Sequence, residues 1–292
     1  MELGRLGIGC SVESLSAAQA IGMARKFEAM GYGTMWFGEL VAGRDPFVMA
    51  SLLLANSARI RIGLCVANVW KREAAAMINA ARTLAGLYED RFVLAVGVSH
   101  QKFVDLYGLH YERPYQFMRE YLAKMKAAPF LGPRLKHEPP VLIAAQRPLM
   151  MKLARQTDGV FVTFAPPALT AHARAVVGAD KIVCAIQAVV LQTDPAKAHA
   201  IGREYTSFYS RLPNYRDRLI EMGFEEADFK DGGSERLIDA IVAWGPREQL
   251  LRRIEEQFAA GATHVYVLPL SSSAATGSPV IDEATARALA PG

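Results

Sequence analysis

The feature that most constrains the fold is a strand–helix–strand pattern between residues 61 and 98. Arg61 to Val69 and Phe92 to Val98 are short, nearly continuous apolar runs, which are typical of buried strands. Between them, residues 73–88 place alanine, methionine and leucine side chains at helical spacing. Two strands joined through a helix by short connections must be parallel. Parallel strands end at one edge, and that edge is where α/β proteins bind their ligands.

The same sequence of features recurs along the chain: an amphipathic helix, a break at glycine, aspartate or asparagine, and a short apolar strand. It predicts eight strands, at residues 6–10, 34–38, 61–69, 92–98, 141–145, 160–164, 182–191 and 264–268. Residues 101–113 are predicted to be a polar, aromatic-rich loop that covers a site. Residues 212–244 show no strand candidate and are interpreted as an inserted helical segment. Because no repeat or linker divides the chain, residues 1–292 are predicted to form a single domain.

Strands that alternate with helices allow two α/β architectures, a doubly wound open sheet and a closed (β/α)8 barrel. Gly7 and Gly9 begin a glycine pattern in the first predicted strand. Val12, however, stands where a dinucleotide-binding fingerprint requires its third glycine. The number of strands and their even spacing therefore favour the TIM barrel.

Composition excludes several classes of function. The net charge of +4 is small for 292 residues, and the basic residues are scattered among acidic ones, so neither nucleic-acid nor membrane binding is predicted. Glu2 and Arg5 precede any apolar stretch, which argues against a signal peptide, and we expect a cytoplasmic protein. The three cysteines lie far apart in predicted strands, so neither a disulfide framework nor a metal site is expected.

Several stretches resemble the bacterial luciferase-like monooxygenase superfamily, and in particular its branch that depends on the deazaflavin coenzyme F-420. They are Gly33–Glu39, Arg61–Val69, Arg91–His100, Val141–Ala145, Leu212–Arg216 and Ala243–Gly245. Together they span nearly the whole chain in the family's order and spacing. The resemblance implies a TIM barrel, usually a homodimer, with a flavin or deazaflavin lying across the carboxyl-terminal mouth.

The resemblance also implies a cofactor site. In the family, the third strand bulges behind the cofactor ring through a cis peptide without proline, and Cys65–Val66 occupies that position. Arg147, with the free amides of a helix that begins at Pro148, is expected to meet the phosphate. Asn68 and Gln187 are expected to hydrogen bond to the pyrimidine-like edge of the ring. The predicted cofactor-binding residues are Cys65, Val66, Ala67, Asn68, Gly97, Val98, Ser99, Ala144, Ala145, Gln146, Arg147 and Gln187.

Glu39 is the first candidate catalytic residue, because it ends the second predicted strand where relatives carry an acidic residue. Many relatives follow it with a histidine that handles protons, but Leu40 stands here. His100 is the replacement candidate, since an imidazole changes its charge near neutral pH. Glu39 could instead pair with Arg44 or Arg147 as part of the structure.

The substrate side is assigned to side chains that can stack on a planar cofactor or shield it. These residues are Trp70, Phe103, Tyr107, Asn214 and Tyr215. The segment Lys71–Ala74 stands where many relatives have a proline before the helix. This departure is expected to alter the shape of the loop more than the chemistry.

The resemblance implies hydride transfer between the deazaflavin and a small organic substrate, with orientation and a proton donor supplied by the protein. In deazaflavin, a carbon replaces the ring nitrogen that lets reduced flavin react with oxygen, so a dehydrogenase or reductase is expected. Two alternatives stay open. One is an FMN-dependent monooxygenase on the same barrel, supplied by a separate reductase. The other is a family member that binds a cofactor or ligand without turnover.

Overall fold

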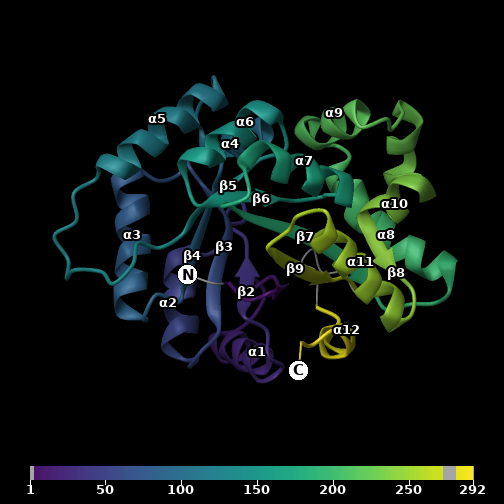
Figure 1. Ribbon diagram of the computed structural model, residues 1–292, viewed down its shortest axis with the longest axis horizontal. Helices are drawn as coiled ribbons and strands as arrows, with labels where there is room; N and C mark the ends of the chain where they lie inside the picture. The colour runs from purple at the N-terminus through teal and green to yellow at the C-terminus, as the bar shows by residue number, and fades with distance from the viewer. Residues whose placement is uncertain (1–2, 272–280, 292) are drawn as a thin grey trace.

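Eight parallel strands close into a barrel in the computed structural model, which describes residues 3–271 and 281–291 (Figure 1). Each strand pairs in parallel with its neighbours, and the last pairs with the first, which closes the ring. The predicted TIM barrel is therefore confirmed, and the doubly wound sheet is excluded. The barrel strands are β1 (Leu6–Gly9), β2 (Thr34–Phe37), β3 (Arg61–Asn68), β4 (Phe92–Gly97), β5 (Val141–Ala144), β6 (Gly159–Val162), β7 (Ile182–Val190) and β9 (His264–Pro269).

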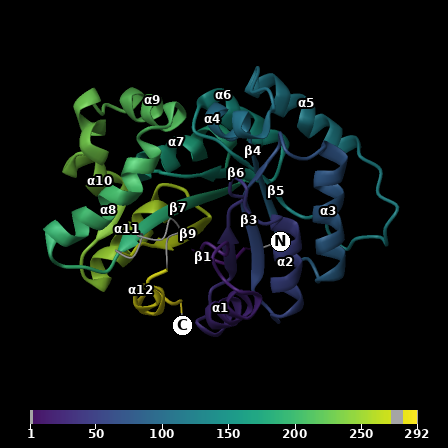
Figure 2. The ribbon, with the colours of Figure 1, turned by 180° about the vertical axis from the view of Figure 1, so that it is seen from behind.

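Helices surround the barrel, as the two opposite views show (Figures 1 and 2). Several begin where a side chain caps free backbone amides: Ser16 and Gln19 form a capping box at α1, and Asp45 caps α2. The helices are α1 (Ala17–Ala29), α2 (Pro46–Ala55), α3 (Ala74–Leu87), α4 (Gln101–Val104), α5 (Pro114–Ala127), α6 (Pro148–Leu153), α7 (Pro167–Val177), α8 (Pro195–Tyr209), α9 (Pro213–Glu221), α10 (Glu235–Ile241), α11 (Arg247–Ala259) and α12 (Glu283–Ala288). Short 3-10 turns are η1 (Asp105–Tyr107), η2 (Ala154–Gln156) and η3 (Glu226–Gly232).

Two segments differ from the prediction. The segment 212–244 is predicted to lack a strand, but Val242–Trp244 forms β8, which pairs only with the last residues of β7 and lies outside the closed ring. A strand of three residues is too short to produce a recognisable pattern in the sequence. The segment 101–113, predicted as a loop, contains α4 and η1.

The strand side chains alternate between two apolar regions. Those that point inward, among them Trp36 and Phe161, fill the barrel, whereas those that point outward pack beneath the helices. Trp36 is fully buried, and Gly63 on the next strand makes room for it: a Cβ there would lie 2.2 Å from Trp36 Cε3. Because the interior is filled, the barrel is a packed core, and ligands have access only at its ends.

His264 is buried at the start of β9, next to Trp36. The Trp36 indole nitrogen donates to His264 Nε2 at 2.9 Å, and His264 Nδ1 donates to the carbonyl oxygen of Gly4 at 2.7 Å. Burial lowers the pKa of His264 to about 4. The ring is therefore neutral near pH 7, with both of its nitrogens in hydrogen bonds.

Candidate active site

The end of β3 forms a bulge at the carboxyl-terminal mouth of the barrel. The register between β3 and β4 shifts between Cys65 and Ala67, and the Cys65–Val66 peptide bond is cis, as the resemblance implies. Val66 lies against Gly97 of β4: a Cβ on Gly97 would be 3.0 Å from Val66 Cγ2 and 3.3 Å from Ala144 Cβ. Cys65, Val66 and Ala144 are partly exposed, although most strand residues are buried. These three residues form a small apolar surface, which we call the seat.

The predicted neighbours of the seat lie at the same end of the barrel. Ser99 and Gln146 are partly exposed at its edge. Gln146 Nε2 donates to the backbone oxygen of Thr163 at 2.5 Å and to its Oγ1 at 3.1 Å, which ties the end of β5 to the end of β6. The buried members of the predicted set support the seat from the strand ends; they are Ala67, Asn68, Gly97, Val98 and Ala145.

Glu39 and Lys71 form an ion pair beyond the ends of β2 and β3. Glu39 Oε1 lies 2.5 Å from Lys71 Nζ, and Glu39 Oε2 accepts a hydrogen bond from the backbone nitrogen of Asn68 at 2.8 Å. The two side chains are 10% and 23% exposed, respectively. Lys71 Nζ also lies 4.7 Å from the centre of the Tyr107 ring. Burial acts to lower the pKa of Lys71, but the hydrogen bond and the negative charge of Glu39 outweigh it and raise that pKa.

Lys71 is a site residue that sequence reasoning missed. Neither Arg44 nor Arg147, the two alternatives considered from the sequence, is the partner of Glu39. The departure at Lys71–Ala74 therefore does more than reshape a loop, because it places a cation beside the carboxylate. A lysine three residues after a strand that ends beside Glu39 was the available signal.

Breaking this pair from either side is expected to destabilise the protein. Lys71→Met leaves a mostly buried carboxylate without its cation, and Glu39→Gln leaves the ammonium without its carboxylate. Each variant is expected to lose about 1–3 kcal/mol of unfolding free energy, and the double variant less than the sum. Urea denaturation of all four proteins measures the coupling, and strictly additive losses would contradict a direct pair. Arg72→Met, which removes a more exposed cation that pairs with Asp45, is the matched control.

His100, after β4, packs among aromatic rings at the mouth. Its ring centre lies 5.4 Å from that of Tyr215 and 5.9 Å from that of Phe103. Burial, and then the nearby ammonium of Lys102, lower the pKa of His100 to about 4. The expectation that this imidazole changes charge near neutral pH is therefore wrong. The neutral ring keeps one nitrogen that donates and one that accepts.

An aromatic wall, composed of His100, Phe164, Tyr209 and Tyr215, borders the mouth. Phe164 stacks on Tyr209 with ring centres 5.0 Å apart, and Tyr215 meets Tyr209 edge-on at 5.0 Å. The Tyr215 hydroxyl shares a hydrogen bond of 2.9 Å with Thr163 Oγ1. Tyr215 is thus placed at the mouth, as the resemblance implies. Phe164 and Tyr209 were missed because isolated aromatic residues in these segments form no motif.

Gln187 does not reach the mouth, and its predicted cofactor contact is wrong. Ile186, the preceding residue of β7, faces the barrel interior, so Gln187 faces the helices. Its Nε2 donates to the carbonyl oxygens of Ala188 at 2.8 Å and Ile241 at 3.1 Å, and its Oε1 accepts from Gln257 Nε2 at 3.0 Å. Both ends of the amide are therefore satisfied inside the protein.

Trp70 also differs from its predicted place on the substrate side. Its ring stacks on Phe117 of α5 at 3.8 Å, and its indole nitrogen donates to the carbonyl oxygen of Val98 at 2.8 Å. It packs with the outer apolar region. Phe103 and Tyr107, in contrast, belong to α4 and η1 beside the mouth. Burial raises the pKa of Tyr111, and the side chain of Asn214 acts in the opposite direction, which places Asn214 near the Tyr111 hydroxyl. Trp70 therefore supports the mouth from outside.

Arg147 follows β5 as predicted, but its charge is already engaged. Its guanidinium lies 3.5 Å from the carboxylate of Asp217 and 3.1 Å from that of Glu221, both on α9. The following helix, α6, begins at Pro148 as predicted and spans Pro148–Leu153, and η2 follows it directly. A phosphate at this position would have to compete with two carboxylates for the guanidinium.

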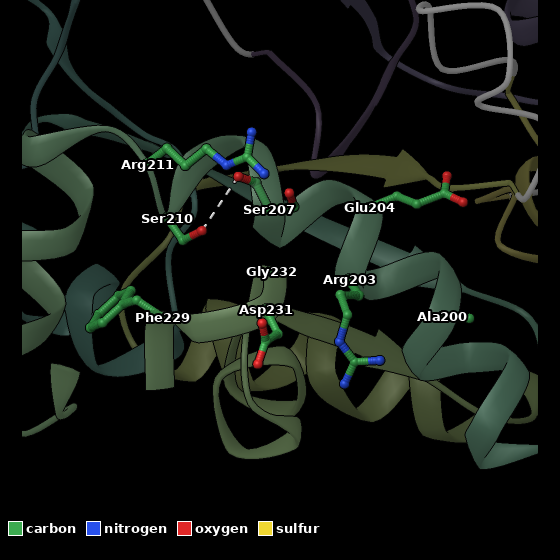
Figure 3. Close-up of a pocket in the computed structure, with 9 residues that line it drawn as sticks. All are labelled: Ala200, Arg203, Glu204, Ser207, Ser210, Arg211, Phe229, Asp231 and Gly232. Atoms are coloured by element: carbon green, nitrogen blue, oxygen red, sulfur yellow. Dashed lines mark hydrogen bonds between the residues drawn. The ribbon is translucent and has the colours of Figure 1, made fainter. Parts of the chain in front are cut away.

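A separate pocket of about 590 Å³ lies on the outer side of α8 (Figure 3). Arg203 and Ser207 line it from one face of α8, Arg211 lines it from just beyond the end of that helix, and Asp231 and Gly232 of η3 line its other side. Tyr205 and Tyr209, which belong to the inner apolar cluster, lie on the opposite face of the helix. This pocket is therefore not part of the mouth.

The described residues contain no group of three or more His, Cys, Asp or Glu side chains that could hold a metal ion. The three cysteines are free, and Cys10 and Cys184 are buried. Within the same residues, no helix is both long and apolar enough to cross a membrane.

A closed parallel barrel, with its partly exposed apolar and polar groups gathered at the carboxyl ends of the strands, defines a TIM-barrel enzyme. The family model described as luciferase-like monooxygenase matches residues 4–264. Since this match covers most of the chain, the protein belongs to the luciferase-like monooxygenase family.

The chain is also similar to individual known proteins. The 5,10-methylenetetrahydromethanopterin reductase of Methanolobus tindarius is 22% identical over an alignment of length 286. This alignment covers 83% of this chain and 87% of that protein. The structure of the coenzyme F-420-dependent tetrahydromethanopterin reductase from Methanopyrus kandleri has a TM-score of 0.77 at 17% identity, covering 100% of this chain and 98% of that one. A type II Baeyer–Villiger monooxygenase from Pseudomonas putida, in complex with FMN, has a TM-score of 0.65 at 13% identity and covers 89% and 91%. At these identities, the structural likeness concerns the fold.

Proposed function

We propose that the protein is a coenzyme F-420-dependent oxidoreductase that transfers a hydride between the cofactor and a small organic substrate. The observation that carries the proposal is the seat, a partly exposed apolar surface at the mouth of a luciferase-like barrel. A flat ring is bound by apolar contact with its face and by a few polar groups at its edge. The similarity to a reductase from Methanolobus tindarius over 83% of this chain, and to the coenzyme F-420-dependent reductase from Methanopyrus kandleri over 100% of it, supports a deazaflavin reductase.

The residues of the mouth fit a planar heterocycle. Gly97 and Ala144 bring no bulky side chain to the strand ends, so Val66 and the backbone are left as the contact surface. Ser99 and Gln146 offer polar groups at the edge of the seat. Arg147 would contribute to phosphate binding only by exchanging one of its carboxylate partners.

The bound deazaflavin would donate or accept the hydride. It would not support oxygenation, because it lacks the ring nitrogen through which reduced flavin reacts with oxygen. The protein's own residues bind, orient and shield. The carboxylate of Glu39 fixes the Lys71 ammonium beside the mouth, where a cation stabilises negative charge that develops on a substrate oxygen. The neutral His100 can hydrogen bond to a ligand without adding a charge. The aromatic wall limits the access of water on its side of the mouth.

Titration of the purified protein with deazaflavin and with FMN tests the proposal. Deazaflavin is expected to bind at least about tenfold more tightly, which corresponds to about 1.4 kcal/mol. The loaded protein is then expected to exchange hydride with a member of a panel of alcohols, ketones and imines. Tighter binding of FMN, with substrate oxidation that consumes oxygen, would overturn the deazaflavin assignment.

An FMN-dependent monooxygenase supplied by a separate reductase is the second candidate, and the FMN complex of the Pseudomonas putida enzyme on a similar barrel favours it. A member that binds cofactor without turnover is the third. Leu40 in place of a histidine, and the neutrality of His100, favour this third candidate. Tight deazaflavin binding without hydride exchange would support it. The homodimer also stays a proposal, which size-exclusion chromatography tests.

A further inference from the structure

Exposed apolar side chains lie on three segments beside the mouth: the loop after β2, the segment of α4 and η1, and the end of α8. The Tyr107 hydroxyl accepts a hydrogen bond from the backbone nitrogen of Ala42 at 2.7 Å, which joins η1 to the loop after β2. Phe103 stacks on Phe208 with ring centres 6.1 Å apart and planes 12° apart, which joins α4 to α8. Four apolar residues along these joints are well exposed: Leu40 by 44%, Val41 by 39%, Leu106 by 69% and Phe208 by 50%. We call these four residues and Phe103 the apolar rim.

The charges beside the rim are mostly compensated within the protein. Lys71 is paired with Glu39, and the guanidinium of Arg147 is paired with two carboxylates of α9. His100 is neutral near pH 7. Lys102 differs, since its ammonium lies over aromatic rings, 4.8 Å from the centre of Phe103 and 5.8 Å from that of Phe208. A ligand at this mouth therefore meets exposed apolar surface, together with cations that already interact with carboxylates or aromatic rings of the protein.

We propose that the substrate is an uncharged carbonyl or alcohol compound with an extended apolar substituent, which lies along the apolar rim while its oxygen faces the Glu39–Lys71 pair. As a statement about a substrate, this inference rests on the proposed function, but its binding test does not require turnover. The transfer of apolar ligand surface from water to the exposed rim lowers the free energy of the complex. An ionised group would lose its hydration and find its counter-charges already paired.

Two naphthalene probes of matched shape test the inference by calorimetry on the whole protein. The ketone 2-acetonaphthone is uncharged, whereas 2-naphthoate carries a carboxylate on the same ring. The ketone is expected to bind at least roughly tenfold more tightly. Lengthening the chain from 2-butanone to 2-hexanone and 2-octanone is expected to raise affinity roughly threefold per methylene. Equal or tighter binding of 2-naphthoate, or an affinity for the three ketones that does not depend on chain length, would overturn the proposal.

Point variants place the binding on the rim. Phe208→Ala removes one of two stacked rings and is expected to weaken 2-acetonaphthone binding roughly 3- to 10-fold. Leu131→Ala is the control, because this leucine is fully exposed in the connection from α5 to the start of β5, at the other end of the barrel. Lys102→Met is expected to leave ketone binding intact. If 2-naphthoate binds well and Lys102→Met removes that binding, the site recognises an anion and the proposal is wrong.

Two further measurements distinguish substrate binding at the rim from contact between two protein copies and from cofactor binding. If the apolar rim were an interface between two copies, Phe208→Ala would change the oligomeric state on size-exclusion chromatography while ketone affinity stayed constant, and this result would overturn the proposal. The deazaflavin titration is independent of ketone binding. A protein that binds the ketone series as expected but not deazaflavin would contradict the proposed function while supporting the apolar site.

Discussion

Deazaflavin binding is expected to be lost when Ala144 is replaced by tryptophan. Ala144 is the last residue of β5, points inward and is one of the three partly exposed residues of the seat. An indole at this position would cover Val66 and occupy the volume that a planar ring needs. The expected loss of affinity is at least roughly 100-fold, or about 2.7 kcal/mol, measured by titration of the variant with deazaflavin.

Leu87→Trp on α3 is the matched control for this experiment, because it adds the same side chain at a residue that is 65% exposed on the outside of the barrel. This control is expected to bind deazaflavin like the parent protein. Circular dichroism and urea denaturation establish that both variants are folded. A folded Ala144→Trp variant with undiminished affinity would show that the cofactor does not use the seat.

The folded state is expected to lose stability as the pH falls from 6.5 towards 4, with His264 and His100 as the two main contributors. The pKa of His264 is lowered from 6.5 to about 4 in the folded protein. Above 6.5 neither state binds the extra proton, and between the two values the unfolded chain binds it while the folded protein does not. The contribution of this group therefore is present above 6.5 and declines to a loss of about 3 kcal/mol near pH 4.

The main physical cause is burial, which disfavours the charged form of the ring. The hydrogen bond from Trp36 to His264 Nε2 also has to break when that nitrogen takes a proton. His264→Gln removes one of two titrating rings and is expected to reduce the pH dependence of the unfolding free energy by roughly half, even if the variant is less stable at pH 7. His110→Gln, in an exposed loop, is the control and is expected to keep the parent slope. An unchanged slope in His264→Gln would assign the acid sensitivity elsewhere, with His100, whose pKa is lowered in the same direction, as the next group to test.

The alternation of apolar strands and helices was enough to predict the barrel and the positions of its eight strands. The bulge at Cys65 and Val66 was not predictable from local pattern, because two mid-sized apolar residues in a strand look alike whether the chain is regular or kinked. Family resemblance located it. The short strand β8 was missed because three residues give no periodicity.

Side-chain direction explains most of the errors in the site. The family resemblance predicts Gln187 near the mouth, but its position on β7 turns it toward the helices, where Gln257 donates a hydrogen bond to it. Trp70 follows β3 closely in sequence, yet it packs on α5. The opposite difference concerns Lys71, which the sequence predicts to affect only the shape of a loop, although it pairs with Glu39. Each outcome depends on which neighbours surround the side chain, and a single sequence does not contain that information.

The stretch from α8 to β8 forms one side of the mouth, and the seat is formed by other parts of the chain. Tyr209, Tyr215 and Phe208 all come from the contiguous stretch that runs from α8 to β8, whereas the seat comes from β3 and β5. This stretch is held to the barrel by the pairing of β8 with β7, by the ion pairs of Arg147 with α9 and by the hydrogen bond between Tyr215 and Thr163, and none of these contacts involves the seat. An exchange of this one stretch between homologues is therefore expected to change the side of the mouth formed by Tyr209, Tyr215 and Phe208 while leaving the seat in place.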